Sequence, residues 1–402
     1  MRIKIEKGRA VGKITAPPSK SMSHRMLIAA ALARGTSVIH GISNCEDVLA
    51  SIDCLTALGA EFEWQHDMIT VRGADFNLSH PDQVLFCRES GSTLRFMIPV
   101  SLLTGTEVTF EGAPGLMQRP MTVYEDLFSK KNISYTKSDN QILLNGTMSG
   151  GEYELPGNIS SQFVSGLLFA LPLLETSSTI RLTTQVESRS YIDMTIQALE
   201  TFGVRVEWTD GQTLQIEGGQ IYEPREVTVE GDASGAAFPE ALNLFGGSVQ
   251  VDGLISNSLQ GDSVYPRLFN ELITGAPTIS IADCPDLAPI LMTVAAAKNG
   301  ATFTETARLK IKESDRASVL AQELQKFGMK VSVEKNTVRV EAVKWHAPTA
   351  ELYGHNDHRI VMALAVLCTL TGGVINGAEA VSKSYPGFWS DLRALGIIAT
   401  EI

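Results

Sequence analysis

Two kinds of segment alternate along the whole chain, and this repetition limits the possible folds more than any other feature of the sequence. The first kind is an amphipathic helix that ends at a glycine and is followed by a charged hairpin. Clear copies run from Asp47 to Gly59, from Tyr191 to Gly203 and from Ser314 to Gly328, and weaker copies begin near Pro120, Asp262 and Tyr385. Glycine suits these ends because many helices close on a left-handed residue.

The second kind of segment is a helix of small and aliphatic residues that opens at a polar cluster and leads into a strand. The run Leu27-Ile28-Ala29-Ala30-Ala31-Leu32 is apolar nearly all round, which is typical of a buried helix. The openings are Ser19-Lys20-Ser21, Ser90-Gly91-Ser92, Ser160-Ser161-Gln162, Asp232-Ala233-Ser234, Asp286-Leu287-Ala288 and Asn356-Asp357-His358.

Six such pairs in 402 residues give roughly 67 residues per unit. The repetition predicts an α/β protein of two domains with three units each. The last unit lacks a returning strand, and the alternating residues 2–7 are expected to supply it. We therefore expect one domain over residues 15–228 and a second domain formed by residues 1–14 and 229–402.

Charge and cysteine usage exclude several classes of function. A formal net charge of −12 argues against nucleic acid or an anionic membrane as the main partner. The five cysteines form no CxxC pair, so neither a disulfide framework nor a zinc site is expected. Buried thiols, an N-terminus unlike a signal peptide and an apolar run of only 360–370 predict a cytoplasmic protein that does not enter membranes.

Basic residues accompany several helix openings, which points to anionic ligands. The start of a helix offers unpaired N–H groups and a partial positive charge. Ordinary capping explains Ser and Asp at these positions, but not the neighbouring Lys20, Arg25, Arg95 and Arg359. If the buried helices of a domain run parallel, their openings face one side and together favour an anion.

Two further clusters in the C-terminal half have the same character. Residues 310–316 contain five charged residues in seven, and a cap at Ser314 accounts for the acidic residues but not for Lys312 and Arg316. His355 and His358 are three residues apart without a third ligand nearby, so no metal is assigned. Arg359 is the better candidate there because its guanidinium matches carboxylate or phosphate geometry.

Taken together, these motifs resemble those of the 3-phosphoshikimate 1-carboxyvinyltransferases (EPSP synthases), in the family's order and over essentially the full chain. The motifs are Ser19-Lys20-Ser21, Gly91-Ser92-Thr93-Leu94-Arg95, Gln118-Arg119-Pro120, Ser160-Ser161-Gln162, Gly231-Asp232-Ala233-Ser234, Lys312-Glu313-Ser314-Asp315-Arg316, Asn356-Asp357-His358-Arg359 and Ser382-Lys383. The resemblance implies two domains of three βαβαββ units each, an inside-out α/β barrel. It also implies an enolpyruvyl transfer from phosphoenolpyruvate to the 5-hydroxyl of shikimate 3-phosphate, in the shikimate pathway of aromatic amino acid biosynthesis.

The resemblance further implies a set of binding residues. Shikimate 3-phosphate is expected to contact Lys20, Ser21, Arg25, Ser160, Ser161, Gln162, Ser188, Asp286 and Lys312. Phosphoenolpyruvate is expected to contact Lys20, Gly91, Arg119, Gln162, Arg316, Arg359 and Lys383. Both substrates are polyanions, which explains so many cations in one site.

The expected catalytic residues are Asp286, Glu313, Lys20 and Lys383. Asp286 suits the base that takes the hydroxyl proton, and Glu313 suits the donor to the methylene carbon, a duty that Lys20 could share. No metal or organic cofactor is implied. A monomer and inhibition by glyphosate are the remaining expectations from the family.

The chain departs from the family pattern at three positions, namely Pro18, Glu89 and Arg308, and Arg308 is left out of the site for that reason. The nearest alternative enzyme transfers enolpyruvate to UDP-N-acetylglucosamine and carries a cysteine in the loop before an Arg-Pro pair. Residues 112–120 form that loop here and contain no cysteine. A non-catalytic, anion-binding relic of the fold is the other alternative, although it would not be expected to keep the four catalytic residues.

Overall fold

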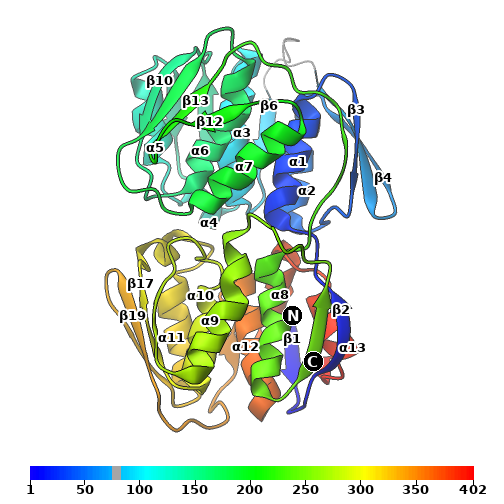
Figure 1. The fold of residues 1–402 in the computed structure, drawn as a ribbon, viewed down its shortest axis with the longest axis vertical. Coiled ribbons are helices and arrows are strands. Elements are labelled where there is room, and N and C mark those ends of the chain that lie inside the picture. The colour runs from blue at the N-terminus through cyan, green and yellow to red at the C-terminus, as the bar shows by residue number, and fades with distance from the viewer. Residues whose placement is uncertain (75–82) are drawn as a thin grey trace. The chain divides into compact units, whose positions relative to one another are not determined.

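The structure is a computed structural model that describes residues 1–74 and 83–402. The chain forms two compact units, which are described separately (Figure 1). Unit 2 comprises Pro18–Glu230, and unit 1 comprises Met1–Pro17 together with Gly231–Ile402. Each unit has its own hydrophobic core.

Three buried helices form the centre of unit 2: α1 (Lys20–Leu32), α3 (Gly91–Ser101) and α6 (Ser161–Ala170). Each helix opens at a serine whose side chain accepts a backbone N–H, namely Ser19, Ser90 and Ser160. These caps satisfy N–H groups that the helix itself leaves unpaired. The predicted openings of the three helices are therefore confirmed.

Amphipathic helices cover this centre, as the first kind of repeated segment predicts. They are α2 (Glu46–Ala57), α5 (Thr122–Ser129) and α7 (Arg189–Thr201), and a short helix α4 (Pro114–Met117) precedes α5. The chain leaves α2 and α7 through Gly59 (φ 99°) and Gly203 (φ 84°). Only glycine adopts such angles without cost, so both predicted helix ends are confirmed.

Three four-stranded sheets form the outer walls of unit 2, each made of a parallel pair followed by an antiparallel hairpin. In the sheet ordered β10-β11-β13-β12, for example, Tyr153 pairs with Ile180 and Ile180 with Leu214. The first sheet borrows its outer parallel strand, β14, from the end of the unit. The strands are β3 (Thr36–His40), β4 (Glu61–Gln65), β5 (Met68–Arg72), β6 (Gln83–Phe86), β7 (Val108–Glu111), β8 (Ser134–Lys137), β9 (Gln141–Asn145), β10 (Gly151–Leu155), β11 (Ser178–Leu182), β12 (Val206–Trp208), β13 (Thr213–Ile216) and β14 (Glu226–Thr228).

Unit 1 repeats this plan with the buried helices α8 (Ala233–Ala241), α10 (Ala288–Ala297) and α12 (His358–Thr371). Asp232 and Asp357 cap α8 and α12 with their side chains. In contrast, α10 begins after Leu287 without a side-chain cap, so Asp286 is not the cap that its place in the opening suggested. The outer helices are α9 (Tyr265–Thr274), α11 (Arg316–Gln325) and α13 (Phe388–Ala394).

The predicted N-terminal strand is confirmed. Strand β1 (Arg2–Ile5) lies between β21 (Gly373–Asn376) and β22 (Ala399–Glu401) and is antiparallel to both. Ile3 and Ile5, both 1% exposed, reach the core from β1. The remaining strands of the two complete sheets are β16 (Thr278–Ser280), β17 (Ala301–Thr304), β18 (Lys330–Val333), β19 (Thr337–Glu341) and β20 (Leu352–Tyr353).

Six complete repeats were expected, but the repeat that contains α8 is incomplete. Its sheet contains only β2 (Val11–Thr15) and β15 (Ser248–Asp252). The reason is chain length, because α9 ends at Thr274 and β16 of the next repeat begins at Thr278. The three residues between them cannot form the two-stranded hairpin that ends each of the other repeats.

Candidate active site

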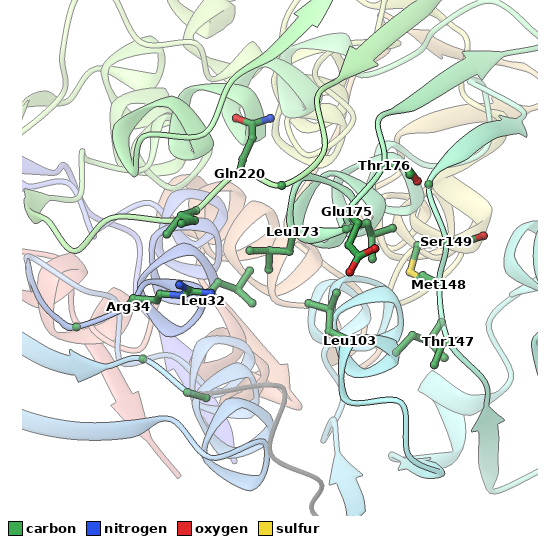
Figure 2. Close-up of a pocket in the computed structure, with 18 residues that line it drawn as sticks. Leu32, Arg34, Leu103, Thr147, Met148, Ser149, Leu173, Glu175, Thr176 and Gln220 are labelled. Carbon is green, nitrogen blue, oxygen red and sulfur yellow. The ribbon is translucent and has the colours of Figure 1, made fainter.

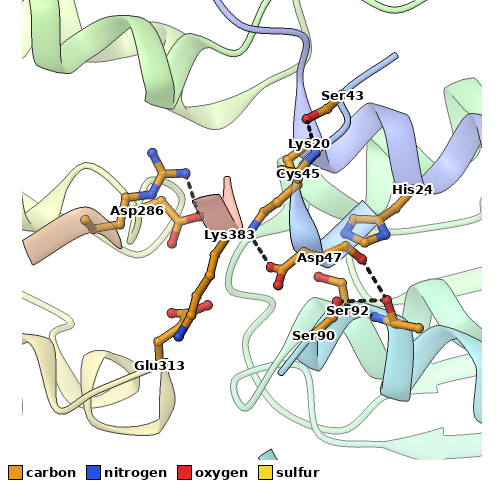
Figure 3. Close-up of polar contacts among 12 residues, drawn as sticks. Lys20, His24, Ser43, Cys45, Asp47, Ser90, Ser92, Asp286, Glu313 and Lys383 are labelled. Atoms are coloured by element: carbon orange, nitrogen blue, oxygen red, sulfur yellow. Dashed lines mark hydrogen bonds and ion pairs between the residues drawn. The ribbon is translucent and has the colours of Figure 1, made fainter. Parts of the chain in front are cut away.

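The openings of the three central helices of unit 2 meet at one end of that unit. Lys20 is the first residue of α1, and its ammonium lies 2.8 Å from Asp47 Oδ2 at the start of α2 (Figure 3). Both side chains are largely buried. A buried cation needs an anionic partner, so Asp47 holds Lys20 charged and in place.

Arg25 lies one turn after Ser21 on α1 and is 2% exposed. Its guanidinium donates to Thr195 Oγ1 at 2.8 Å, to the Ser21 carbonyl at 2.7 Å and to the Tyr191 carbonyl at 2.8 Å. Burial lowers the pKa of Arg25 to about 10, which still leaves it charged at neutral pH. These three partners are neutral, and Arg25 forms no ion pair with a carboxylate of residues 1–74 and 83–402, which suits an anionic ligand.

Gln162 connects the openings of α6 and α3. Its Oε1 accepts from Arg95 Nη1 at 2.6 Å, and its Nε2 donates to Ser92 Oγ at 2.8 Å. Gly91, the first residue of α3, lies against Arg119, since a Cβ at position 91 would stand 2.5 Å from Arg119 Nη1. The structure thus brings together three of the four predicted phosphoenolpyruvate residues of this unit: Gly91 lies against Arg119, and Gln162 bonds Ser92, the residue after Gly91. The fourth, Lys20, lies on α1.

A buried chain of hydroxyl groups runs behind this end of unit 2. His24 Nδ1 lies 2.8 Å from Ser51 Oγ, which lies 2.8 Å from Thr93 Oγ1. Thr93 in turn donates to Ser90 Oγ at 2.8 Å and to the Asp47 carbonyl at 3.2 Å (Figure 3). The chain fixes α1, α2 and α3 to one another directly behind Lys20 and Gly91.

The remaining predicted residues of unit 2 are serines. Ser160 caps α6, Ser161 opens that helix and is 7% exposed, and Ser21 follows Lys20 on α1. Ser188 precedes α7, is 2% exposed and has a φ of 55°, which is unusual for a residue other than glycine. Such strain is often found at binding sites.

In unit 1 the predicted residues converge on Arg316, which is 1% exposed. Its guanidinium donates to Asp286 Oδ1 at 2.7 Å, to Glu313 Oε2 at 2.7 Å and to Asp357 Oδ2 at 2.9 Å. Burial opposes its charge, but Asp357, Glu313 and Asp286 outweigh burial and raise the pKa of Arg316 well above its ordinary value. Arg316 is therefore a permanent cation that orients three carboxylates.

Asp286 also faces two further cations. Lys312 Nζ lies 3.3 Å from its Oδ1, and Arg359 Nη2 lies 3.7 Å from its Oδ2. Burial lowers the pKa of Lys312, with Asp286 acting in the opposite direction. Asp286 thus pairs with three cations, which fix the position of a carboxylate that could accept a proton as a general base.

Arg359, at the first turn of α12, is 2% exposed. Its Nη2 donates to Ser234 Oγ at 2.6 Å, so the openings of α8 and α12 meet. Its Nε and Nη1 are buried and have no hydrogen-bond partner in residues 1–74 and 83–402. Unpaired buried donors on a cation are costly, and an anion with acceptor oxygens would satisfy them.

Lys383 lies at the end of a 3₁₀ segment (Ala378–Lys383) and is 8% exposed. Its ammonium donates to the Asn356 carbonyl at 2.7 Å, in the loop that leads into α12. Lys383 is thereby tied to the segment that carries Asp357 and Arg359.

Asp47 and Asp357 have no assigned role among the sequence-based predictions, yet they hold Lys20 and Arg316. In the sequence, Asp357 stands out only as part of the helix opening Asn356-Asp357-His358. No local pattern links Asp47 to Lys20, because the two are 27 residues apart. Ser314 was expected to cap α11, but Asp315 does so, and Ser314 instead donates to Asp357 Oδ2 at 3.0 Å. Arg308 donates to the Ala282 carbonyl.

A cavity of about 1360 Å³ lies at the opposite end of the central helices of unit 2. Leu32, Leu103 and Leu173 line it where α1, α3 and α6 have ended, and Arg34, Glu175 and Gln220 lie around it (Figure 2). None of the predicted site residues lines this cavity.

The structure also bears on the excluded functions. Across the described part of the chain, no helix combines the length and the apolar character that crossing a membrane requires. All five cysteines are free and buried, as predicted. None lies in the loop 112–120, which contains α4.

The chain is similar to known proteins over nearly its whole length. A family model described as EPSP synthase (3-phosphoshikimate 1-carboxyvinyltransferase) matches residues 5–272 and 266–392. A 3-phosphoshikimate 1-carboxyvinyltransferase of Clostridium perfringens is 37% identical over 98% of this chain and 98% of its own. The protein of the same name from Clostridium acetobutylicum is 40% identical over 98% of this chain and 97% of its own.

Solved structures agree in fold. An EPSP synthase from Acinetobacter baumannii superposes with a TM-score of 0.79 over all of both chains, at 23% identity. The enolpyruvyl transferase NikO from Streptomyces tendae superposes with a TM-score of 0.75 over 99% of this chain and 98% of its own, at 14% identity.

Proposed function

The chain belongs to the EPSP synthase (3-phosphoshikimate 1-carboxyvinyltransferase) family, and from this premise we propose that it transfers enolpyruvate from phosphoenolpyruvate to shikimate 3-phosphate. The products are 5-enolpyruvylshikimate 3-phosphate and inorganic phosphate, in the shikimate pathway. The observation that carries this proposal is Arg359, a buried guanidinium whose Nε and Nη1 have no partner in the described residues. A carboxylate or phosphate of phosphoenolpyruvate would supply the missing acceptors.

The binding roles follow the division of the residues between the units. In unit 2, Lys20, Ser21, Arg25, Ser160, Ser161, Gln162 and Ser188 are proposed for shikimate 3-phosphate, with Gly91 and Arg119 beside phosphoenolpyruvate. In unit 1, Asp286 and Lys312 are proposed for shikimate 3-phosphate, and Arg316, Arg359 and Lys383 for phosphoenolpyruvate. Lys20 and Gln162 are proposed to contact both substrates.

The chemistry proceeds by addition and elimination. The 5-hydroxyl oxygen adds to C2 of phosphoenolpyruvate and its proton passes to Asp286, while C3 gains a proton. The tetrahedral adduct then loses a proton from C3, and phosphate leaves with the electrons of the C2–O bond. Asp286 fits the base because it is a carboxylate that Arg316 and Lys312, at 2.7 and 3.3 Å, hold in place.

Glu313 and Lys20 are the candidate donors of the proton to C3. The 2.7 Å contact with Arg316 favours the charged form of Glu313, whereas the Lys20 ammonium carries a proton that it can donate. A Glu313→Gln variant that retains turnover would assign the proton to Lys20. Loss of turnover in this variant, with shikimate 3-phosphate binding intact, would assign it to Glu313.

The test of the proposed function is phosphate release from phosphoenolpyruvate, with shikimate 3-phosphate or UDP-N-acetylglucosamine as acceptor. We expect release with the first acceptor only, because the loop 112–120 lacks the cysteine of the alternative enzyme. Release with UDP-N-acetylglucosamine alone would favour that alternative. Release with neither acceptor, from protein that binds both anions, would favour a non-catalytic relic.

We also propose that the enzyme acts as a cytoplasmic monomer and is inhibited by glyphosate. Five buried thiols suit a reducing compartment. Light scattering after size-exclusion chromatography would measure the mass, and 43.4 kDa is the value for one chain.

A further inference from the structure

Glu323 is a buried carboxylate that lies outside the set of residues proposed to touch the substrates. It lies on α11 seven residues after Arg316 and is 2% exposed. Residues seven apart are two turns apart on the same face of a helix. This face of α11 contacts both ends of the loop 353–357. Glu323 bonds Tyr353 at the start of the loop, and Arg316 bonds Asp357 at its end.

Three donors satisfy the Glu323 carboxylate. Its Oε2 accepts the backbone N–H of Tyr353 at 2.9 Å and the Lys326 ammonium at 2.7 Å. Its Oε1 lies 3.0 Å from His355 Nε2. Lys326 also donates to the Glu351 carbonyl at 2.9 Å, so the carboxylate and its lysine hold both the strand before the loop and the loop itself.

The loop has a conformation that needs such support. His355 and Asn356 have φ angles of 50° and 53°, in the left-handed region that residues with a side chain rarely occupy. Two successive residues of this kind persist only where the surrounding structure determines their conformation. The Asp357 N–H bonds to the Gly354 carbonyl at 2.9 Å, which closes the turn.

The conformation of the loop decides where two cations of the candidate site lie. The Asn356 carbonyl receives the Lys383 ammonium at 2.7 Å. Asp357 caps α12 by accepting the N–H of Arg359 at 2.9 Å. If the loop relaxed, Lys383 would lose its bond to the Asn356 carbonyl and the first turn of α12 would lose its cap.

We infer that Glu323 is a positioning residue for phosphoenolpyruvate, acting through the loop 353–357 on Lys383 and Arg359. The inference rests on the proposed function, because it takes these two cations as phosphoenolpyruvate ligands. The effect on shikimate 3-phosphate is expected to be smaller, because Asp286, one of its proposed ligands in unit 1, is linked to Asp357 of this loop through Arg316.

The experiment compares Glu323→Ala and Glu323→Gln with Glu341→Gln. Glu341 is a matched control on β19 of the same unit, because its side chain is 57% exposed and lies 3.9 Å from Lys330. The Michaelis constants for both substrates, kcat and the melting temperature are measured for each protein. Michaelis constants do not depend on the fraction of folded enzyme, so partial unfolding cannot imitate the effect.

We expect Glu323→Ala to raise the KM for phosphoenolpyruvate by about tenfold to a hundredfold, the scale of a misplaced binding group. The KM for shikimate 3-phosphate should rise much less, because Asp286 is linked to the loop only through Arg316. Glu323→Gln keeps one acceptor oxygen and should give a smaller rise in the same direction, and it decides the matter if the alanine variant does not fold. Equal changes in both Michaelis constants, or a fall in melting temperature alone, would overturn the inference.

A binding measurement separates this inference from the proposed function. The rise in melting temperature on adding phosphoenolpyruvate to protein with shikimate 3-phosphate is compared between wild type and the variants. Suppose that the wild type shows no turnover, but that phosphoenolpyruvate raises its melting temperature and not that of Glu323→Ala. This result would contradict the proposed function and support the positioning role. A wild type without any rise would overturn both.

Discussion

Asp286 pairs with three of the four cations that unit 1 contributes to the candidate site, since Lys312, Arg316 and Arg359 all lie within 4 Å of its oxygens. We predict that Asp286→Asn lowers kcat by at least about 100-fold, the usual scale of general base catalysis. The amide keeps the shape of the carboxylate but cannot accept the proton, so binding of shikimate 3-phosphate should remain measurable by calorimetry.

Asp283→Asn is the control for this variant. Asp283 lies three residues earlier in the same segment and is exposed, so its substitution should leave kcat unchanged. Turnover near the wild-type value in Asp286→Asn would remove Asp286 from the proton transfer.

Gly91 makes a second prediction at this scale, because a Cβ there would stand 2.5 Å from Arg119 Nη1. The far end of the Arg119 side chain would have to move, so Gly91→Ala should raise the KM for phosphoenolpyruvate. We expect a larger rise in the inhibition constant of glyphosate, which is longer and would meet the added methyl group first.

The melting temperature distinguishes this effect from loss of packing. Alanine is favoured over glycine in a helix by about 1 kcal/mol, so Gly91→Ala should not melt earlier than wild type. Unchanged kinetics would show that Gly91 does not line the phosphoenolpyruvate site, whereas a large fall in melting temperature would indicate tight packing of α3.

Sequence could identify the cations of the site but not most of their acidic partners. Lys20, Arg316 and Arg359 stand in recognisable motifs at helix openings. Asp47 and Asp357 lie 27 and 41 residues from the cations that they hold. Such pairs depend on how neighbouring helices pack, which local patterns do not encode.

At the scale of elements, α11 and α12 are both capped by an aspartate, but the two caps should contribute differently to the free energy of unfolding. Asp315 caps α11 from a partly exposed position, whereas Asp357 is 0% exposed and also accepts from Arg316 and Ser314. We predict that Asp315→Ala lowers the free energy of unfolding by about 1 kcal/mol. Asp357→Ala should lower it by about 3–5 kcal/mol, because it leaves Arg316 with an unpaired buried donor.

Denaturant unfolding of the two variants would measure the difference. Equal losses would mean that the Arg316–Asp357 contact adds nothing to the capping of α12.

The buried chain between α1, α2 and α3 predicts a dependence of stability on pH. Burial, followed by the charges of Lys20 and Arg25, lowers the pKa of His24 well below its ordinary value of 6.5. Below pH 6.5 the unfolded chain therefore binds a proton that the folded protein does not. His24 should make the free energy of unfolding fall by about 1.4 kcal/mol per pH unit as the pH drops below 6.5.

Replacing His24 by Gln should remove this part of the acid dependence. Unfolding free energies at pH 7 and pH 5 would be compared for the two proteins. The same slope in His24→Gln would assign the acid sensitivity to other groups.

Element boundaries were largely predictable, because serine and aspartate caps and closing glycines are local signals. Ser19, Ser90 and Ser160 precede their helices as expected, and Gly59 and Gly203 follow theirs. The missing hairpin after α9 was not predicted. The repeat pattern suggested six equal units, whereas the short connection between Thr274 and Thr278 excludes two further strands.

At the scale of the whole molecule, unit 1 is built from two separate stretches of chain, Met1–Pro17 and Gly231–Ile402. The continuous stretch Pro18–Glu230, which forms unit 2, lies between them in the sequence. We predict that deleting residues 2–5 destabilises unit 1 alone. The deletion would remove β1 from the middle of its sheet, together with the buried Ile3 and Ile5.

Hydrogen exchange followed by mass spectrometry would test this prediction. Amides of β21, β22 and α12 should exchange faster in the deleted protein, and amides of α1, α3 and α6 should exchange as in wild type. Uniformly faster exchange would show instead that the two units do not unfold separately.

The central position of β1 in its sheet has a consequence for folding during synthesis on the ribosome. Residues 2–5 are synthesised well before residues 373–376 and 399–401, which are their hydrogen-bonding partners. At about 5–20 residues per second, the interval is roughly 20 to 70 seconds. During that time a strand with two open edges and two apolar side chains, Ile3 and Ile5, has no sheet to join, while the residues of unit 2 emerge and can fold first. A holding chaperone would therefore have most reason to protect residues 2–5 until residues 373–376 and 399–401 are available.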